Sequence, residues 1–335
     1  MKNNFKIYIE LPGIYLFLLK QVWKQKRFNK KYLDPKLELY KKRNDGSLTE
    51  KDLKKITDYY ALGVSGILGT SFCILRGYKM KLAERKVISY LGGISGLLDD
   101  LFDDTSKETQ GFKDFILSPQ EMTPNNVQEA LLIDLYTEGL KECSRSEKIQ
   151  QLALNVFQTQ QESLKQKDNS INKLELEKIT FAKGGSSFLY YRACLENIAD
   201  QNEKELIYHL GGLMQLGNDI FDVYKDRQEN IQTLATRTID INVLRNYFQT
   251  ELERSFELAK VCNYPAKNIE KFLKIISLGI ARVYVCLDQF KLLQLKSDGK
   301  FDIEKYNRKE LICDMQKPRN QLKAIQYYFE IISEN

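Results

Sequence analysis

The sequence predicts an all-α protein, on three observations. The hydrophobic content of 43% over 335 residues is enough for a sizeable core, in one large domain or two small ones. Long amphipathic stretches dominate the chain, and alternating β-branched runs are few. The chain has only six prolines to interrupt helices.

The N-terminal segment, residues 1–45, is basic and partly apolar. IYLFLLKQVW at 14–23 is too short to span a bilayer, and no signal-peptide cleavage pattern follows it. We interpret the segment as a helix packed on a main domain of residues 46–335. A peripheral membrane contact through Tyr15–Trp23 and the nearby lysines and arginines is the alternative.

Further helices are expected along the main domain. A turn with a capping box from Ser47 to Glu50 precedes a helix through Leu53 and Ile56. A helix starting near Lys81 leads to an acidic cluster, and residues 105–125 are expected to form a polar loop. The paired glycines Gly184–Gly185 predict a kink or break with exposed amides in a helix that starts at Lys173. The remaining expected helices are 126–142, 146–165, 242–261, 266–293 and 317–332.

Charge and cysteine content restrict the class of protein. The net charge is +6, and the lysines are scattered except for a cluster at 20–42, so we expect no nucleic-acid partner. Six cysteines lie far apart without a CxxC pair, which indicates reduced thiols in a cytoplasmic chain. His209 is the one histidine, which disfavours a histidine-based triad or zinc site.

A first acidic cluster lies in LGGISGLLDDLFDD at 91–104, within apolar flanks. On a helix, Asp99 and Asp103 are stacked at i and i+4, and Asp100 and Asp104 form a second pair. Two carboxylates at that spacing repel by about 3 kcal/mol at an effective dielectric near 20, so they need a counter-charge. Oxygen-only ligands suit Mg²⁺. Small residues before the cluster either leave room for an apolar substrate or allow close helix packing.

A second stretch, GGLMQLGNDIFDVYKD at 211–226, repeats this chemistry. Asn218, Asp222 and Asp226 are spaced i, i+4 and i+8, which places three oxygen ligands on one helix face. Lys225 beside Asp226 is typical of a phosphate contact. The alternative is an amphipathic helix with a polar stripe.

These motifs resemble those of class I isoprenoid synthases. DDLFD at 99–103 is similar to the DDxxD motif, and NDIFDVYKD at 218–226 resembles the NDxxSxxxE motif of terpene synthases. Asp222 stands where that family has Ser or Thr, and Asp226 where it has Glu. Gly211, Gln215, Asp219 and Asp222 also fall in register with the second motif of chain-elongating prenyltransferases. FAKGGSSFLYYRACL at 181–195 resembles the lysine-bearing helix break of the superfamily.

The resemblance implies a single-domain helical bundle around a central cavity, in which a linear polyprenyl diphosphate is ionised and cyclised. It implies Mg²⁺ as the cofactor, with three ions when substrate is bound. The implied metal ligands are Asp99, Asp100, Asp103, Asn218, Asp222 and Asp226. Asp99, Lys183 and Lys225 are the implied catalytic residues. The implied diphosphate contacts are Lys183, Gly184, Lys225, Arg192, Arg282 and Tyr284.

Several features stay open at the sequence level. Tyr306 and Arg308 compete with Arg282 and Tyr284 as the arginine–tyrosine pair of the cyclases. Arg76 and Lys79 are either solvated charges near a helix end or diphosphate contacts. The missing basic pair after Asp104 and the missing upstream GGKR stretch favour a cyclase over a chain-elongating or head-to-head prenyltransferase. A non-catalytic partner subunit and a homodimer are further alternatives.

Overall fold

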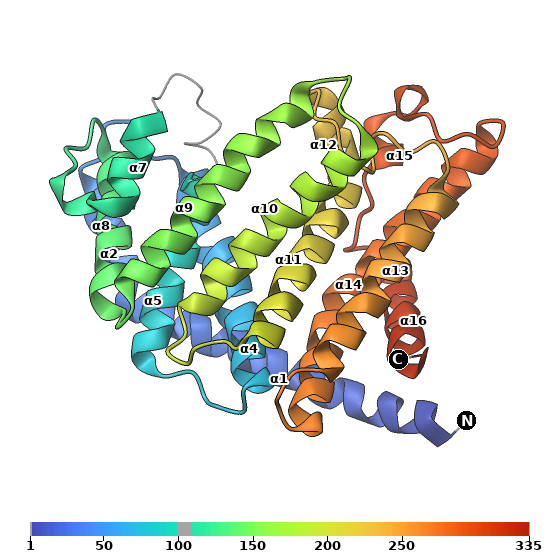
Figure 1. Cartoon of the computed structure of the whole chain (residues 1–335), viewed down its shortest axis with the longest axis horizontal. Helices are drawn as coiled ribbons and strands as arrows, with labels where there is room; N and C mark the ends of the chain where they lie inside the picture. The colour runs from blue at the N-terminus through green and yellow to red at the C-terminus, as the bar shows by residue number, and fades with distance from the viewer. Residues whose placement is uncertain (1, 99–108, 335) are drawn as a thin grey trace. The chain divides into compact units, whose positions relative to one another are not determined.

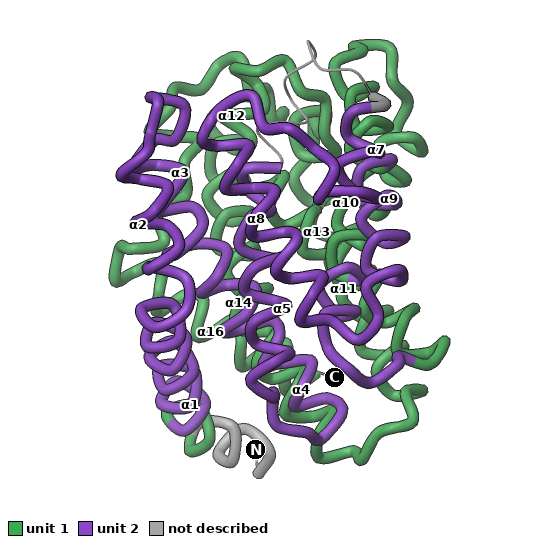
Figure 2. Tube along the Cα trace, turned by 90° about the vertical axis from the view of Figure 1, so that its left-hand side faces the viewer, with its two compact units in different colours: residues 1–12, 159–188, 200–335 green, residues 13–158, 189–199 purple. Residues whose placement is uncertain are grey.

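The protein is all-α, as predicted. The computed structural model describes residues 2–98 and 109–334, and these residues contain no β-strand (Figure 1). The contacts between residues divide the chain into two compact units (Figure 2). Unit 1 comprises residues 1–12, 159–188 and 200–335, and unit 2 comprises residues 13–158 and 189–199. The predicted boundary after residue 45, the single domain and the central cavity stay predictions.

Unit 2 is built around α5, which packs against the π-helical segment η1 and against α8. Its elements, with the helices that continue into unit 1, are α1 (Lys2–Tyr32), α2 (Asp34–Lys42), α3 (Glu50–Lys54), η1 (Lys55–Gly69), α4 (Thr70–Leu75), α5 (Leu82–Gly93), α7 (Thr109–Leu117), η2 (Pro119–Glu121), α8 (Val127–Glu142) and α9 (Ser146–Ser163).

Glycines let the helices of unit 2 approach closely. A Cβ atom at Gly92 would lie 2.8 Å from Cγ1 of Val64, and one at Gly96 would lie 2.5 Å from the ring of Tyr60. Side chains of η1 therefore fill the space that these glycines leave. Of the two readings of the small residues before the acidic cluster, the structure favours close helix packing.

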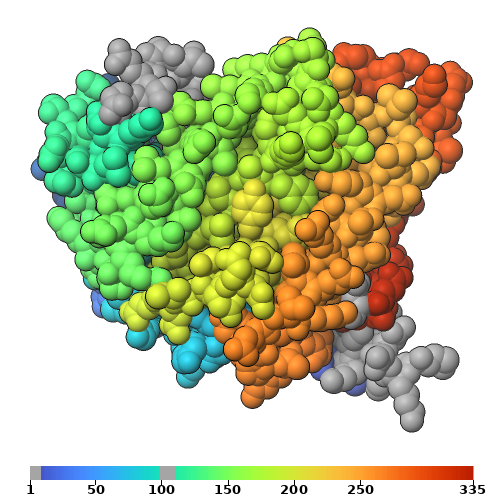
Figure 3. All heavy atoms as spheres, viewed as in Figure 1, coloured from blue at the N-terminus to red at the C-terminus, as the bar shows by residue number. Residues whose placement is uncertain are grey.

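Unit 1 places α11 against α13 and α14, and α14 against α16. In the space-filling view, α14 is orange and the C-terminal helix α16, which packs against it, is red (Figure 3). Its elements are η3 (Leu164–Lys167), α10 (Lys173–Ala193, shared with unit 2), α11 (Gln201–Phe221), α12 (Val223–Gln228), α13 (Ile241–Lys260), α14 (Ala266–Lys296), η4 (Ile303–Lys305), α15 (Arg308–Leu311) and α16 (Pro318–Glu334).

Of the kink or break predicted at Gly184–Gly185, the break is wrong, because α10 is continuous through both residues. The glycines instead allow α10 to cross α11 in backbone contact. A Cβ atom at Gly184 would lie 2.0 Å from the carbonyl oxygen of Gly211, and one at Gly212 would lie 2.2 Å from the ring of Phe181. Any side chain at the centre of this crossing would push the two helices apart.

Two further local predictions need correction. The capping box is formed two residues later than expected, by Thr49 and Asp52, because the Asp52 carboxylate also accepts from the Thr49 N–H at 2.8 Å. The expected loop 105–125 contains the helix α7, whose Phe115 and Ile116 are buried. Apolar residues at helical spacing within this polar stretch are the signal for α7 that the sequence reading missed.

One described helical run, Glu50–Leu75, is long and apolar enough to cross a membrane by length and composition. Within the protein, 61% of its most apolar window is buried. A core helix of a soluble protein has the same properties, so this run is weak evidence for a membrane span.

Candidate functional site

The candidate site lies in unit 1, where α11 ends and α12 begins. The backbone is irregular at Asp222 (φ −93°, ψ 8°), so the motif does not lie on one continuous helix as expected. The amide N–H of Asp222 still bonds the carbonyl of Asn218 at 2.9 Å, and that of Asp226 bonds the carbonyl of Asp222 at 2.8 Å. The i, i+4, i+8 spacing is thus kept locally, although Asn218 is exposed and Asp226 is buried.

Asp219 is an acidic residue of this site that the predicted ligand set leaves out. Its side chain is buried and accepts hydrogen bonds from Gln215 Nε2 at 2.8 Å and Thr180 Oγ1 at 3.2 Å. Burial raises the pKa of Asp219 to about 6, although these two bonds and the Lys183 charge oppose the shift. The sequence signal for Asp219 is its register with Gly211 and Gln215 in the prenyltransferase motif. In the structure, Gly211 allows α11 to cross α10 closely, and Gln215 donates a hydrogen bond to the Asp219 carboxylate.

Asp226 is the most perturbed carboxylic acid of the site. Its side chain is only 8% exposed, and no described residue donates a hydrogen bond to its carboxylate. Burial raises the pKa of Asp226 to about 8, and the neighbouring charges of Asp219 and Asp222 add to the shift. A buried carboxylate without a partner is costly in its charged form, so this position would gain most from a bound cation.

Asn218 and Asp222 form the exposed side of the site. The Asn218 amide donates to Asp222 Oδ2 at 3.3 Å. Burial raises the pKa of Asp222, and the charge of Lys225 and this hydrogen bond oppose the shift. The structure thus brings together the three predicted ligands of the second motif, and it adds Asp219 behind them.

Two lysines supply positive charge to this cluster. The Lys183 ammonium has no ion pair among the described residues, and its charge lowers the pKa of both Asp219 and Asp226 against the effect of burial. Lys225 is exposed and lies 3.9 Å from Glu229, a weak surface pair. Both predicted lysines therefore belong to the electrostatic surroundings of the second motif.

The two residues of the predicted arginine–tyrosine pair, Arg282 and Tyr284, both lie on α14 but have different surroundings. Arg282 is exposed, and its guanidinium carbon lies 6.0 Å from the ring centroid of Phe221, next to Asp222. Tyr284 is buried, stacks on Tyr327 and donates to Gln249. Arg282 thus lies beside the candidate site, whereas Tyr284 belongs to a packed cluster with α13 and α16.

The competing pair, Tyr306 and Arg308, belongs to the segment beside α12. Arg227 on α12 donates to the Tyr306 carbonyl at 2.9 Å, and the Tyr306 ring is buried. Arg308 is exposed in the first turn of α15. The segment with η4 and α15 thus packs against α12.

Gly184 and Arg192 are the two remaining predicted diphosphate contacts. Gly184 lies inside the continuous helix α10 and is buried against α11, and its role as a diphosphate contact stays a prediction. Arg192 lies in unit 2, where its guanidinium is buried and donates to the Asn197 carbonyl at 2.9 Å. The role of Arg192 as a diphosphate contact stays a prediction.

The first acidic motif cannot be placed, because Asp99, Asp100, Asp103 and Asp104 lie outside the described residues. Among residues 2–98 and 109–334, no group of three or more His, Cys, Asp or Glu side chains is arranged to hold a metal ion. The second motif offers two carboxylates and one amide oxygen, and the unpartnered Asp226 carboxylate fits a cation. Mg²⁺ commonly takes one or two carboxylates, with waters and substrate phosphates completing its shell.

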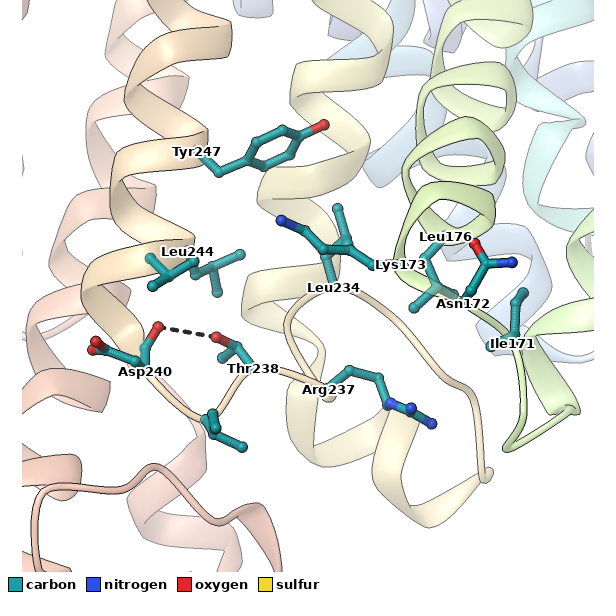
Figure 4. A pocket seen from close by; sticks show the side chains of 12 residues that line it. Ile171, Asn172, Lys173, Leu176, Leu234, Arg237, Thr238, Asp240, Leu244 and Tyr247 are labelled. Atoms are coloured by element: carbon teal, nitrogen blue, oxygen red, sulfur yellow. Dashed lines mark hydrogen bonds between the residues drawn. The ribbon is translucent and has the colours of Figure 1, made fainter.

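A pocket of about 320 Å³ elsewhere in unit 1 contains none of the predicted site residues. Figure 4 shows Lys173 and Leu176 from α10 opposite Leu244 and Tyr247 from α13. The Lys173 ammonium lies 5.7 Å from the centroid of the Tyr247 ring. The carboxylic acids with strongly raised pKa values, Asp219 and Asp226, lie around α12, whereas the pKa of Asp240, which lines this pocket, is lowered by hydrogen bonds. We therefore place the candidate chemistry at the second motif.

No protein-family model matches the chain, and neither a curated protein nor a solved structure shows significant similarity to it. The functional argument therefore depends on the motifs and on the geometry of the residues around α11 and α12.

Proposed function

We propose that the protein is a Mg²⁺-dependent class I terpene synthase, which ionises a linear polyprenyl diphosphate and cyclises the resulting carbocation. The observation that carries this proposal is the buried Asp226 carboxylate, with a pKa of about 8 and no hydrogen-bond donor among the described residues. Strongly perturbed carboxylic acids cluster at functional sites, and a bound cation would favour their charged forms.

In this proposal Asn218, Asp222 and Asp226 would hold Mg²⁺ together with Asp99, Asp100 and Asp103 of the first motif, which lie outside the described residues. Bound Mg²⁺ would supply positive charge to the diphosphate leaving group. The neutral amide of Asn218 donates to Asp222 and so orients one carboxylate oxygen. Asp219 stays behind the ligands, held by Gln215 and Thr180.

Lys183 and Lys225 bind the diphosphate in this proposal. The Lys183 ammonium, which has no ion pair within the described part of the chain, can approach an anionic ligand without breaking an existing bridge. Arg282 beside Phe221 is a third cation at the same end of α11. Positive groups fixed near the departing diphosphate stabilise the charge that develops as the carbon–oxygen bond breaks.

The main alternative is a prenyltransferase of the same fold. One observation favours it: Gly211, Gln215 and Asp219 occupy the prenyltransferase register, and each has a structural task in the site. The missing GGKR stretch and the missing basic pair after Asp104 favour the cyclase. A second, non-ionising diphosphate would find few positive charges to bind.

Incubation with Mg²⁺ and a series of linear polyprenyl diphosphates, with and without isopentenyl diphosphate, tests the proposal. We expect diphosphate release and a hydrocarbon or terpene alcohol from one substrate alone. An elongated diphosphate that forms only with isopentenyl diphosphate would replace the cyclase by the prenyltransferase. No turnover of any substrate would favour a non-catalytic partner subunit.

Two variants with matched controls test the residues. Lys183→Ala should lower kcat/KM by about 100-fold, because it removes a cation that stabilises the leaving group. Lys178→Ala removes an exposed lysine from the same helix and should leave kcat/KM unchanged. Asn218→Ala should raise the Mg²⁺ concentration needed for half-maximal rate by about 10-fold, whereas Asn246→Ala on α13 should not.

A further inference from the structure

The helix α1 carries an exposed apolar ridge in its unit 2 part. Leu16, Leu19 and Trp23 recur at i, i+3 and i+7, so they lie on one face of the helix. Their exposed fractions are 67%, 64% and 59%, and the neighbouring Tyr15 is 42% exposed. Large apolar side chains gathered on one exposed face are typical of an interaction surface.

The opposite face of α1 already has its packing partners. Ile14, Gln21, Gln25 and Phe28 are buried in unit 2. The Gln25 side-chain amide donates to Ser89 Oγ at 2.9 Å and to Asn29 Oδ1 at 2.8 Å. The ridge is thus the face of α1 that does not pack against the rest of unit 2.

Within residues 13–32, the ridge is flanked by positive charge only. Residues 13–32 contain no Asp or Glu, and all of their cations are exposed: Lys20, Lys24, Lys26, Arg27, Lys30 and Lys31. Leu16, Lys20 and Lys24 are spaced four residues apart, so the two lysines lie along one flank of the ridge. The guanidinium carbon of Arg27 lies 5.7 Å from the centroid of the Trp23 ring. An apolar ridge between basic flanks, with Trp at its edge, matches an anionic bilayer surface.

We propose that this face of α1 binds the surface of a membrane containing anionic lipids, with Leu16, Leu19 and Trp23 in the acyl–headgroup boundary. The helix lies on the bilayer and does not cross it, because among the described helices only Glu50–Leu75 has the length and composition of a span. A second copy of this chain is a poor occupant, since it would bring the same cations against the same face without an acidic residue between 13 and 32.

Trp23 provides a direct measurement, because it is the only tryptophan of the chain. The full-length protein is mixed with vesicles of phosphatidylcholine, or of phosphatidylcholine with phosphatidylglycerol, and fluorescence and sedimentation are recorded. We expect a blue shift of the Trp23 emission and co-sedimentation with the anionic vesicles, and weaker binding at high salt. An unchanged emission and no sedimentation with anionic vesicles would overturn the proposal.

Two groups of variants separate the apolar and the electrostatic contributions. Leu16→Ser with Leu19→Ser should weaken vesicle binding by about 10-fold or more. Lys20→Gln, Lys24→Gln and Lys26→Gln together should weaken it by about 100-fold on anionic vesicles. Circular dichroism checks that each variant keeps its helical content, and the lysine variant tests the proposal if the leucine variant does not fold.

The controls change the same residue types elsewhere. Leu292 and Leu295 on α14 have the same i, i+3 spacing and are 56% and 64% exposed, so Leu292→Ser with Leu295→Ser should bind vesicles like the wild type. Lys296→Gln, Lys300→Gln and Lys309→Gln remove the same charge from exposed positions of unit 1. Equal losses in the control and α1 variants would overturn the proposal. So would a blue shift without vesicles that grows with protein concentration, because it indicates self-association.

Discussion

One buried carboxylic acid from each unit, Glu84 in unit 2 and Asp226 in unit 1, shows two opposite ways of burying an acidic group. In unit 2, Glu84 is buried with the Arg76 guanidinium as its counter-charge, and it also accepts from the N–H groups of Lys81 and Glu196. In unit 1, Asp226 is buried without any hydrogen-bond donor among the described residues. One acid is fully compensated inside the protein, and the other is not.

The pKa directions follow this difference. Burial alone would raise the pKa of Glu84, but the backbone bond from Lys81 and the Arg76 contact outweigh it, and the net shift is downward. Burial raises the pKa of Asp226 to about 8, and the charges of Asp219 and Asp222 raise it further. A compensated buried acid stabilises one packing arrangement, whereas an uncompensated one is typical of a site completed by a ligand.

The largest expected effect is at the compensated pair. Arg76→Ala leaves Glu84 buried without its counter-charge, and we expect a loss of about 3–5 kcal/mol in the free energy of unfolding. Denaturant unfolding at neutral pH measures it. Lys81→Ala removes an exposed partner of Glu196 and should cost less than about 1 kcal/mol. Equal effects of the two variants would mean that Glu84 does not depend on Arg76.

Removing the charge of the uncompensated acid, Asp226, should instead raise the free energy of unfolding. Without divalent cations, Asp226→Asn should raise the free energy of unfolding by about 2–4 kcal/mol near pH 8, because the amide removes the cost of a buried charge. The folded-state pKa of about 8 lies above the ordinary value of 3.8. The contribution of Asp226 to the free energy of unfolding of the wild type is therefore fully present below about pH 4 and is lost as the pH rises through about 8. The Asp226→Asn variant lacks this pH dependence.

Chemical denaturation over this pH range measures the difference, and Asp58→Asn at an exposed position of η1 is the control. Added Mg²⁺ should raise the melting temperature of the wild type more than that of Asp226→Asn. A destabilised Asp226→Asn variant in the absence of metal would contradict the comparison.

The glycine contacts of the two units should also differ. Gly184→Ala places a Cβ atom 2.0 Å from the backbone oxygen of Gly211, so α10 and α11 must separate, and we expect a loss of about 2–3 kcal/mol. Gly92→Ala meets side-chain atoms and no backbone atom, the nearest being a methyl group of Val64 at 2.8 Å, and should cost about 1 kcal/mol. A larger loss for Gly92→Ala than for Gly184→Ala would reverse the order expected from backbone contact.

The smallest expected effect is a gain. Gly279 lies inside α14, and a Cβ atom there would be 3.7 Å from Cε of Met214, an ordinary contact. Gly279→Ala should therefore raise the free energy of unfolding by about 0.5–1 kcal/mol through helix propensity. A loss would show that α14 and α11 pack more tightly at this point than the distance indicates.

Much of the local structure could be predicted because it depends on residues close in sequence. The apolar periodicity placed the helices 126–142, 242–261 and 266–293, which are found as Val127–Glu142, Ile241–Lys260 and Ala266–Lys296. The spacing of Asn218, Asp222 and Asp226 brought these residues together through local backbone bonds. The break at Gly184–Gly185 was wrong because glycine propensity describes an isolated helix, whereas here a second helix occupies the space.

The sequence by itself therefore determined the helical class, most helix positions and the local spacing of Asn218, Asp222 and Asp226. Only the tertiary structure decided which charges are buried and which are compensated. Arg76, expected as a solvated charge or a diphosphate contact, is 4% exposed and donates to Asn197, 121 positions along the chain. Desolvation and counter-charge depend on groups that are far apart in sequence, so neither can be read from local spacing.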